Sequence, residues 1–359
     1  MSGFDTVYPA DSVEFCPQEG SRHVFVCGTY KLEQSKQQGE ASDPDIPWEP
    51  LKQCRRGNCL VFGVSSTHPS KLEQLQRISL PAVLDMKWCH RSGPAALGIA
   101  DSEGNVSFHE WQADQNRLTH LQTVSCALSD VLCLSLDWSD RRYHAHDLGN
   151  LVVSLSDGSI SVLRPDSHRG MVITDSWPAH DYEPWIAAWN YWDTNVIFSG
   201  GDDLKMKGWD CRQGSGHPIF INKQFNAGVT TIQSHPFVEH AVAVGSYDDT
   251  VRLFDMRKPL VPVLEADVGG GAWRVKWHPH ASRKEDLLVA CMHDGFKILK
   301  MDVSLGNSSE IRWEVAKRFD AHTSLAYGVD WSFEDVDDVD DTLIGSCSFY
   351  DHMLHLWRG

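Results

Sequence analysis

The stretch ACMHDGFKIL, residues 290–299, carries a histidine where related stretches of the same chain carry an aspartate. In GSYDDTVRLF and SLSDGSISVL, an aspartate stands six residues before the last residue, at Asp248 and Asp157. In ACMHDGFKIL the same position is His293. Imidazole titrates near neutral pH and is a common general acid or base. The pattern leaves two interpretations open: an acid–base group, or a polar substitute for the aspartate.

A second set of side chains could bind a cation. It consists of three residues at turns and four at the starts of apolar runs: Asp202, Tyr247 and Tyr350, then Trp185, Trp273, Arg274 and Tyr327. Aromatic faces attract quaternary ammonium groups. An aromatic rim with one arginine therefore predicts a site for a cationic or peptide-like group. For Trp185 and Trp273, packing between neighbouring repeats is the alternative.

The elements that position these residues form a repeat. Seven short apolar runs share a similar phrase: VEFCP, LDMKWC, LSLDWS, AAWNYW, TIQSHP, RVKWHP and GVDWSF. Each is followed by a run rich in small residues, a turn that is usually acidic, and an alternating run. The alternation in TVRLF has the period of two of a half-buried strand. Seven four-stranded units predict an all-β fold, a seven-bladed β-propeller of WD repeats.

We expect the whole chain, 1–359, to form this one propeller. The seventh unit ends at its third strand, so FDTVYP (4–9) is the predicted fourth strand, which closes the ring and removes an exposed sheet edge. The first unit contains a polar segment, 33–57, which predicts a flexible surface loop. The run EDVDDVDD (334–341) predicts a solvated acidic loop in the seventh unit.

Many polar residues have a structural explanation. WD repeats bury a network of a histidine, a serine or threonine, the turn aspartate and a final tryptophan, which satisfies polar groups inside the blade. The pattern assigns His180, Ser199, Asp203 and Trp209 to it in the fourth unit, and His322, Asp351 and Trp357 in the seventh. The sixth unit lacks these residues, because its entry loop DVGGGAW has no histidine and its third strand ends in Leu299. No structural role is therefore prescribed for His293.

Composition narrows the partners and the compartment. The net charge of −17 argues against a nucleic-acid partner. The start of the chain has no secretory signal pattern, and no apolar run approaches the ~18 residues of a membrane span. Ten cysteines without a C-x-x-C pair predict buried free thiols and a cytoplasmic protein. We expect no metal, no cofactor and a monomer, and the default function of such a propeller is a protein-interaction platform.

Several phrases go beyond WD-repeat consensus. The most specific are ACMHDGFKIL and CSFYDHMLHLW, accompanied by ADSVEFCP, WIAAWNYW, SGGDD and WRVKWHP. Together they resemble the diphthine methyl ester esterase family, also described as diphthine methyltransferase, from about residue 10 onward. The resemblance implies hydrolysis of a methyl ester on a modified histidine of translation elongation factor two, which gives diphthine and methanol in diphthamide biosynthesis. A non-catalytic adaptor that presents the elongation factor to another enzyme is the alternative.

The resemblance assigns no catalytic residues, so the site is our own hypothesis. Trp185, Trp273, Tyr350 and Tyr247 would surround the trimethylammonium group of the substrate, and Asp202 would add an opposite charge. His293 would act as general base on a water molecule. Arg274, or the amides of residues 269–271, would stabilise the oxyanion. Cys291 is an alternative nucleophile, which we disfavour because strand alternation near the turn would bury it.

Overall fold

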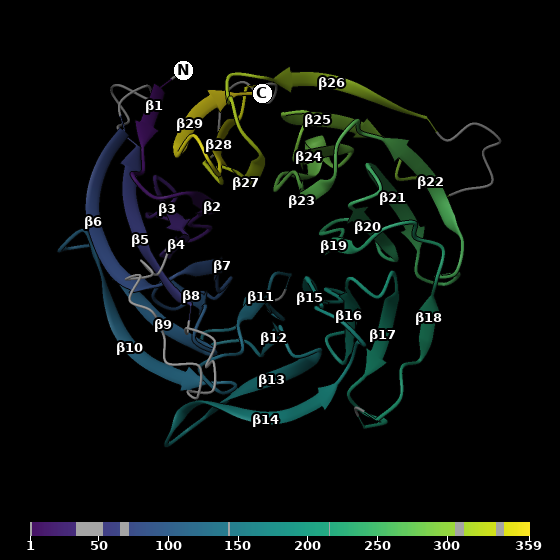
Figure 1. The fold of residues 1–359 in the computed structure, drawn as a ribbon, viewed down its shortest axis with the longest axis horizontal. Helices are drawn as coiled ribbons and strands as arrows, with labels where there is room; N and C mark the ends of the chain where they lie inside the picture. Colours follow the sequence, from purple (N-terminus) through teal and green to yellow (C-terminus); the bar gives the residue numbers. More distant parts are fainter. Residues whose placement is uncertain are drawn as a thin grey trace, which may run out of the picture.

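A computed structural model describes most of the chain, and the ranges are 2–33, 53–64, 72–142, 144–214, 216–305, 312–334 and 341–359. Within them, the strands form seven antiparallel sheets around a common axis, and the sheets form one ring (Figure 1). The one helical element of the described residues is a short 3-10 turn, η1 (Ala281–Arg283). No helix in these ranges is long and apolar enough to cross a membrane. The predicted seven-bladed β-propeller is confirmed.

The inner half of each blade consists of two strands. The innermost strands are β2 (Ala10–Phe15), β7 (Val83–Trp88), β11 (Cys133–Trp138), β15 (Ile186–Trp189), β19 (Val229–Ser234), β23 (Ala272–Trp277) and β27 (Ala326–Trp331). The second strands are β3 (Val24–Thr29), β8 (Ala96–Asp101), β12 (Leu151–Leu155), β16 (Val196–Gly200), β20 (Ala241–Ser246), β24 (Asp286–Cys291) and β28 (Leu343–Ser348). These runs are almost entirely buried, as expected for strands covered on both faces by neighbouring blades.

The outer half of each blade is more exposed. The third strands are β5 (Cys54–Val64), β9 (Asn105–Gln112), β13 (Ser159–Asp166), β17 (Met206–Asp210), β21 (Thr250–Asp255), β25 (Phe296–Met301) and β29 (Met353–Arg358). The outermost strands are β6 (Leu72–Pro81), β10 (Arg117–Ser125), β14 (Gly170–Pro178), β18 (Phe220–Asn222), β22 (Pro262–Asp267), β26 (Trp313–Phe319) and β1 (Ser2–Asp5). An additional short strand, β4 (Lys31–Glu33), pairs with β5 in blade 1.

The ring is closed by the two ends of the described chain, which lie together in blade 7 (Figure 1). β1 pairs with β29 in antiparallel register, from Ser2 opposite Leu356 to Asp5 opposite Met353. The predicted closure is confirmed, but the strand is shorter and earlier than the predicted 4–9. Residues 6–9 turn toward blade 1 instead, and the Phe4 ring packs on Phe62 with centroids 5.0 Å apart.

Two predicted loops are only partly within the described residues. Of the 33–57 segment, Glu33 belongs to β4 and residues 54–57 belong to β5, so both ends of the segment are strand rather than loop. These polar residues form a strand because their main chains pair with β4 at the edge of the sheet, where the side chains of Arg55 and Arg56 need not be buried. Residues 34–52 lie outside the described residues, as does most of the acidic run 334–341.

Indole groups at the ends of the innermost strands join neighbouring blades. Five tryptophans donate Nε1–H to a main-chain carbonyl of the preceding blade: Trp88 to Glu14, Trp138 to Lys87, Trp189 to Asp137, Trp277 to Gln233 and Trp331 to Lys276. In blade 5 the hydroxyl of Ser234 makes the equivalent bond to the carbonyl of Trp189. The repeated tryptophans of the sequence therefore satisfy buried carbonyls between blades.

Candidate functional site

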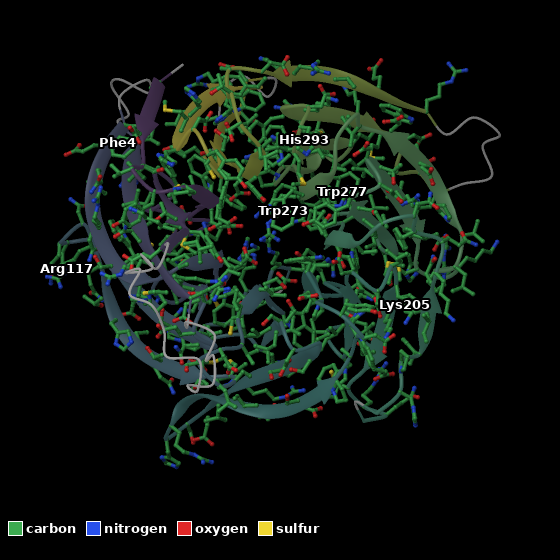
Figure 2. The ribbon with its side chains drawn as sticks, viewed as in Figure 1. Phe4, Arg117, Lys205, Trp273, Trp277 and His293 are labelled. Carbon is green, nitrogen blue, oxygen red and sulfur yellow. The ribbon has the colours of Figure 1, made fainter. Side chains whose placement is uncertain are left out.

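The innermost strands begin with an irregularity that shapes one mouth of the central channel. In six blades the pairing of the first and second strands skips at least one residue; the skipped positions are Asp11, Leu84, Leu134, Thr230, Trp273 and Tyr327–Gly328. Such a bulge bends the strand and re-aims its side chain. In blade 4 the equivalent residue, Trp185, directly precedes β15. These positions bring aromatic residues of different blades together, and Trp273 lies close to the centre of the ring (Figure 2).

The aromatic residues at this mouth contact one another, and we call them the mouth cluster. It comprises Trp185, Tyr247, Trp273, Tyr327 and Phe349. The Trp185 ring lies 5.9 Å from Trp273 and 6.2 Å from Tyr247, centroid to centroid. Trp273 lies 5.9 Å from Tyr247 and 4.9 Å from Tyr327. Trp185 and Trp273 are half-buried rather than enclosed, so the cluster presents ring surface at the mouth. Trp185, Tyr247, Trp273 and Tyr327 of the predicted rim therefore lie together here, and their role in binding stays a prediction.

Asp202 borders the mouth cluster. Its exposed carboxylate accepts a hydrogen bond from Trp185 Nε1 at 3.0 Å. A Cβ atom at Gly228 would lie 2.3 Å from Asp202 Oδ1 and 3.2 Å from the Tyr247 ring, so the carboxylate and the ring border the same small space. An anionic group therefore lies beside aromatic faces, a combination that suits a cation.

Arg274 lies deeper than we predicted. Only 7% of the residue is exposed, and its guanidinium pairs with Asp85 at 3.2 Å. The guanidinium carbon is 5.9 Å from the centroid of the Trp273 ring, so the side chain lies within the channel beside the cluster. The reason is the bulge at Trp273. Because Trp273 is left out of the strand pairing, its side chain is directed to the mouth, and the side chain of Arg274 is directed into the channel.

The ion pairs of blades 4 to 6 explain why blade 6 can carry a histidine in place of the turn aspartate. The third strand of each of these blades places a cation at the same position: Lys207, Arg252 and Lys297. In blade 4, Lys207 lies 3.6 Å from Asp203, and in blade 5, Arg252 lies 3.0 Å from Asp248. Both carboxylates are the turn aspartates that the repeat pattern identifies.

In blade 6 the partner of the third-strand cation is Asp294, the residue after His293. Lys297 pairs with Asp294 at 2.5 Å, and Arg318 binds the other oxygen of the same carboxylate at 2.8 Å. The left-handed backbone position of the turn also moves one residue later, to Gly295, with φ of 69°. His293 is therefore not needed inside the blade, and its side chain is exposed.

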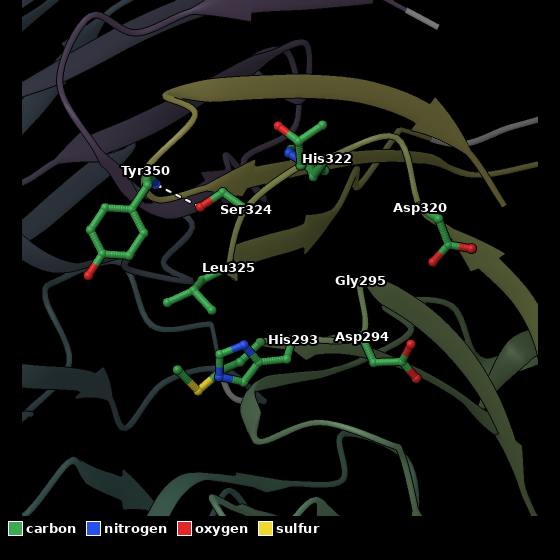
Figure 3. Close-up of a pocket in the computed structure, with 10 residues that line it drawn as sticks. His293, Asp294, Gly295, Asp320, His322, Ser324, Leu325 and Tyr350 are labelled. Carbon is green, nitrogen blue, oxygen red and sulfur yellow. Dashed lines mark hydrogen bonds between the residues drawn. The ribbon is translucent and has the colours of Figure 1, made fainter.

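His293 lines a pocket of about 700 Å³ between blades 6 and 7 (Figure 3). Leu325, Ser324 and Tyr350 border the same pocket, and Ser324 Oγ accepts a hydrogen bond from the main-chain amide of Tyr350 at 2.9 Å. Tyr350 is 70% exposed. The His293 imidazole and the Asp294 carboxylate point in opposite directions, so the imidazole is separate from the ion pairs of the blade (Figure 3).

Two contacts connect this pocket to the mouth cluster. A Cβ atom at Gly271 would lie 3.1 Å from Met292 Sδ and 3.3 Å from the Tyr247 ring, so the turn of blade 6 adjoins the cluster. On the blade 7 side, the Phe349 and Tyr350 rings have centroids 5.0 Å apart. The pocket and the mouth cluster are therefore neighbouring parts of one face of the propeller.

Apart from Arg274, which lies in the channel, the predicted site residues fall into two groups. The structure brings Trp185, Trp273, Tyr247 and Asp202 together at the channel mouth, and His293 and Tyr350 in the adjoining pocket. Among the described residues, no hydrogen bond, ion pair or ring contact joins His293 to Asp202 or Arg274. Cys291 is fully buried, and burial raises the pKa of its thiol to about 12, so it is a poor nucleophile.

The residues that we assigned to structural networks occupy them. In blade 4, His180 bonds Asp203 at 2.8 Å and Ser199 at 2.7 Å, and Trp209 Nε1 donates to Ser199 Oγ at 2.8 Å. The corresponding residues of blade 7 are His322, Ser346 and Trp357, with Ser348 joining His322 to Asp351. All ten cysteines are free, and most are buried. The described residues contain no group of three or more His, Cys, Asp or Glu side chains arranged to hold a metal.

Asp11 is a candidate that the sequence did not single out. It occupies the bulge position of β2 and is 7% exposed. Burial raises the pKa of its carboxyl to about 7, with Arg274 lowering it and Asp85 raising it further. Its charge also affects Tyr247, whose pKa is raised mainly by burial and further by Tyr327, Asp202 and Asp11. A carboxyl that titrates near neutral pH therefore lies beside the mouth cluster, and only its repeat position could have indicated it.

A continuous chain of buried ion pairs runs along the channel below the cluster. Arg274 pairs with Asp85, Asp85 with Lys87 at 2.6 Å, and Lys87 with Glu14 at 2.9 Å. Glu14 in turn pairs with Lys276 at 2.5 Å. These side chains come from three blades and fill the channel, so the mouth cluster lies above a charged floor.

Comparison with known proteins gives consistent names. The chain is 40% identical to mouse "Diphthine methyltransferase" over 343 residues, which cover 93% of this chain and 69% of the relative. It is 35% identical to the "Diphthine methyltransferase homolog" of Dictyostelium discoideum, with 98% and 96% covered. It is 30% identical to the "Diphthine methyltransferase" of Schizosaccharomyces pombe, with 98% of this chain and 95% of that relative covered.

The solved structures add the fold alone. A chain in "Crystal Structure of Mitotic Checkpoint Complex" superposes with a TM-score of 0.69 at 17% identity, covering 99% of this chain and 90% of that chain. At this identity the similarity concerns the propeller and not its site. No protein-family model matches the sequence.

Proposed function

The chain belongs to the diphthine methyltransferase family, and we propose that it is an enzyme acting on the methyl groups of a modified diphthine residue. More specifically, we propose that it hydrolyses the methyl ester of diphthine methyl ester on translation elongation factor two, releasing methanol and diphthine. The single observation that carries this proposal is the mouth cluster with its carboxylate, beside a pocket that contains an exposed imidazole.

The mouth cluster supports binding of the cationic part of this substrate. Diphthine methyl ester carries a trimethylammonium group close to its ester, and such a cation cannot donate a conventional N–H hydrogen bond. Aromatic faces and a nearby negative charge are therefore its suitable partners. Trp185, Tyr247 and Trp273 supply the faces, and Asp202 supplies the charge. Tyr350, at the border of the adjoining pocket, would cover the substrate from the blade 7 side.

His293 is the proposed general base. Its neutral imidazole would accept a proton from a water molecule as the water oxygen bonds to the ester carbonyl carbon. When the resulting tetrahedral intermediate breaks its bond to the methoxy oxygen, the imidazolium would return the proton to that oxygen, and methanol leaves. The product is the carboxylic acid, which ionises to the carboxylate of diphthine. One water molecule is consumed, and the imidazole returns to its starting state.

The developing oxyanion requires a hydrogen-bond donor. We predicted Arg274 for this role, but its ion pair with Asp85 holds it in the channel, so it would have to leave that pair to reach the substrate. Of the main-chain amides of the 269–271 loop, that of Gly269 already donates to Asp267 at 2.9 Å, so those of Gly270 and Gly271 are the donors favoured by position. A Cβ atom at Gly270 would lie 3.2 Å from the amide nitrogen of His293, so this loop directly adjoins the turn of the proposed base.

A direct assay tests the proposal. Purified protein is incubated with elongation factor two that carries diphthine methyl ester, and methanol release and the mass of the modified peptide are followed. We expect stoichiometric methanol and loss of one methylene mass from the peptide. If the isolated protein binds the elongation factor but releases no methanol, the adaptor alternative replaces the enzyme. If neither binding nor release occurs, the substrate assignment is wrong.

A further inference from the structure

A second pocket lies at the opposite end of the channel. Trp273 and Tyr327 are the second residues of β23 and β27 and lie at the mouth cluster, whereas Trp277 and Trp331 end the same strands and line this second pocket. We call it the lower pocket. Its volume is about 340 Å³, at the lower end of the range for small-molecule sites. It shares no lining residue with the pocket of His293 and so belongs to a different part of the molecule.

The lining of the lower pocket is strongly basic, although the chain carries a net charge of −17. The cationic side chains are Arg22, Arg141, Arg142 and Lys276, and the histidines His90 and His144 also line the pocket. Asp330 is the one carboxylate among the described lining residues, and it already contacts Lys276 at 3.5 Å. An acidic protein is not expected to gather cations at one place by composition alone. Because these cations attract negative charge, the pocket favours an anionic ligand.

The local electrostatics agree with this charge count. The pKa of His90 is held well below its usual range, first by burial and then by the positive charges of Arg141, His144 and Lys276. The guanidinium of Arg141 is 3.9 Å from Asp137, a long contact, and that of Arg142 lies over the Trp192 ring at 3.3 Å from its centroid. The cations of the pocket are thus held in place by the scaffold.

Aromatic side chains complete the walls. Besides Trp277 and Trp331, the lining includes Tyr191, Phe237 and Phe333. Phe333 packs edge-on against His90 with ring centroids 5.6 Å apart, so an apolar and a basic group adjoin in the cavity wall. An inorganic anion would use only the basic groups. A ligand with an anionic end and an apolar body would use both.

We propose that the lower pocket binds an organic phosphate monoester, with the phosphate on the arginines and the organic part against the aromatic walls. A phosphate monoester carries up to two negative charges, and its oxygens match the paired N–H groups of arginine. This site is independent of the proposed ester hydrolysis. The ion pairs that run from Lys276 through Glu14, Lys87 and Asp85 to Arg274 place it at the far end of the same charged channel.

The test is a titration of the purified protein with phenyl phosphate, followed by calorimetry and tryptophan fluorescence. Inorganic phosphate and benzoate are titrated in parallel. We expect one saturable phenyl phosphate site, weaker binding of inorganic phosphate, and weaker binding of benzoate. Absence of saturable phenyl phosphate binding overturns the proposal. Equal affinity for benzoate overturns the choice of phosphate.

Variants locate the site. Arg22→Gln and Arg142→Gln should each weaken phenyl phosphate binding roughly tenfold or more, because each removes a charged hydrogen-bond donor. Arg142→Lys, which keeps the charge but loses the paired N–H groups, should bind with intermediate affinity. Arg117→Gln, on the outer strand β10 far from the channel (Figure 2), is the matched control and should bind normally. Unchanged affinity in both pocket variants, with thermal unfolding like that of the control, would show that the ligand binds elsewhere.

Discussion

Arg274 and Asp85 come from blades 6 and 2, yet their charged groups lie 3.2 Å apart, so their ion pair spans the central channel. Asp85 is fully buried and also accepts a hydrogen bond from the amide of Leu136 in blade 3 at 3.1 Å. One carboxylate therefore connects three blades. The channel of this propeller is a structural core of ion pairs, with the candidate site at one end and the lower pocket at the other.

The first prediction concerns this carboxylate. Asp85→Asn removes one charge and leaves Lys87 and Arg274 buried without it, which typically costs about 3–5 kcal/mol of unfolding free energy. Asp320→Asn is the control, because Asp320 is exposed and pairs with Arg318 at 3.1 Å, and such surface pairs contribute at most about 1 kcal/mol. Urea unfolding of both variants measures the difference. Equal destabilisation of the two would contradict the importance of the channel pair.

The second prediction concerns pH. The pKa of Asp11 is about 7 in the folded protein against an ordinary value of 3.8, so between these pH values the folded state holds more protons than the unfolded state. Stability contributed by the neutral carboxyl is therefore lost as pH rises through this window. Asp11→Asn cannot ionise, so its stability relative to the wild type should increase by about 2–3 kcal/mol between pH 5 and pH 8.

Urea unfolding at the two pH values measures this change. A constant difference between the variant and the wild type would mean that Asp11 does not titrate in this range.

The third prediction concerns the proposed base. His293→Ala should lower the turnover number for methanol release by about a hundred- to ten-thousand-fold, because it removes general-base catalysis. The free energy of unfolding should hardly change, since the His293 side chain is exposed and takes no part in the ion pairs of blade 6. His168→Ala, at an exposed turn of blade 3, is the control and should keep normal turnover. Full turnover by a folded His293→Ala protein would remove His293 from the mechanism.

The fourth prediction concerns the cation site. Asp202→Asn keeps the hydrogen-bond acceptor for Trp185 but removes the negative charge, so KM should rise several-fold while kcat changes little. Trp185→Leu should have a larger effect on KM, because it removes an aromatic face as well. The control is Asp166→Asn, at the end of β13 in blade 3, where the carboxylate is partly exposed. If a substrate analogue without the trimethylammonium group shows the same losses, the cluster does not recognise the cation.

The fifth prediction concerns closure of the ring. Deletion of residues 2–5 removes the strand that pairs with β29 and exposes the edge of that sheet. We expect a lower Tm and concentration-dependent association, since an unpaired edge strand can pair with another molecule. Calorimetry and light scattering measure the two effects. A deletion variant that remains monomeric with an unchanged Tm would show that the first strand is dispensable.

The sequence predicted the propeller because each of its seven similar repeats indicates one blade. It also showed that no structural role is prescribed for His293, because the sixth repeat lacks the network residues of other blades, and in the structure this side chain is exposed. Asp294 was not recognised as the replacement partner of Lys297, since a shift of one residue in a turn leaves no periodic signal. The bulges could not be predicted either, because the alternation of polar and apolar residues does not reveal an extra residue in a strand. The bulge in β23 is what places Trp273 at the mouth and Arg274 in the channel.

The channel was the hardest part to predict. Lys276 and Glu14 are separated by 262 positions and meet only because the ring closes with a particular radius. The raised pKa of Asp11 depends on burial by other blades, and the sequence shows only an aspartate in an apolar run. Residue types and repeat positions were therefore predictable, whereas the partners across the channel required the three-dimensional structure.

The pairing of β1 with β29 also dictates an order of events during synthesis. Residues 2–5 leave the ribosome long before residues 353–358 exist, so the earliest strand has to wait, unpaired, for the latest one. Six blades can assemble in the meantime, but the seventh cannot be completed until translation has passed its third strand. A ribosome that stalls late in the message would thus leave an open ring, a natural substrate for chaperones.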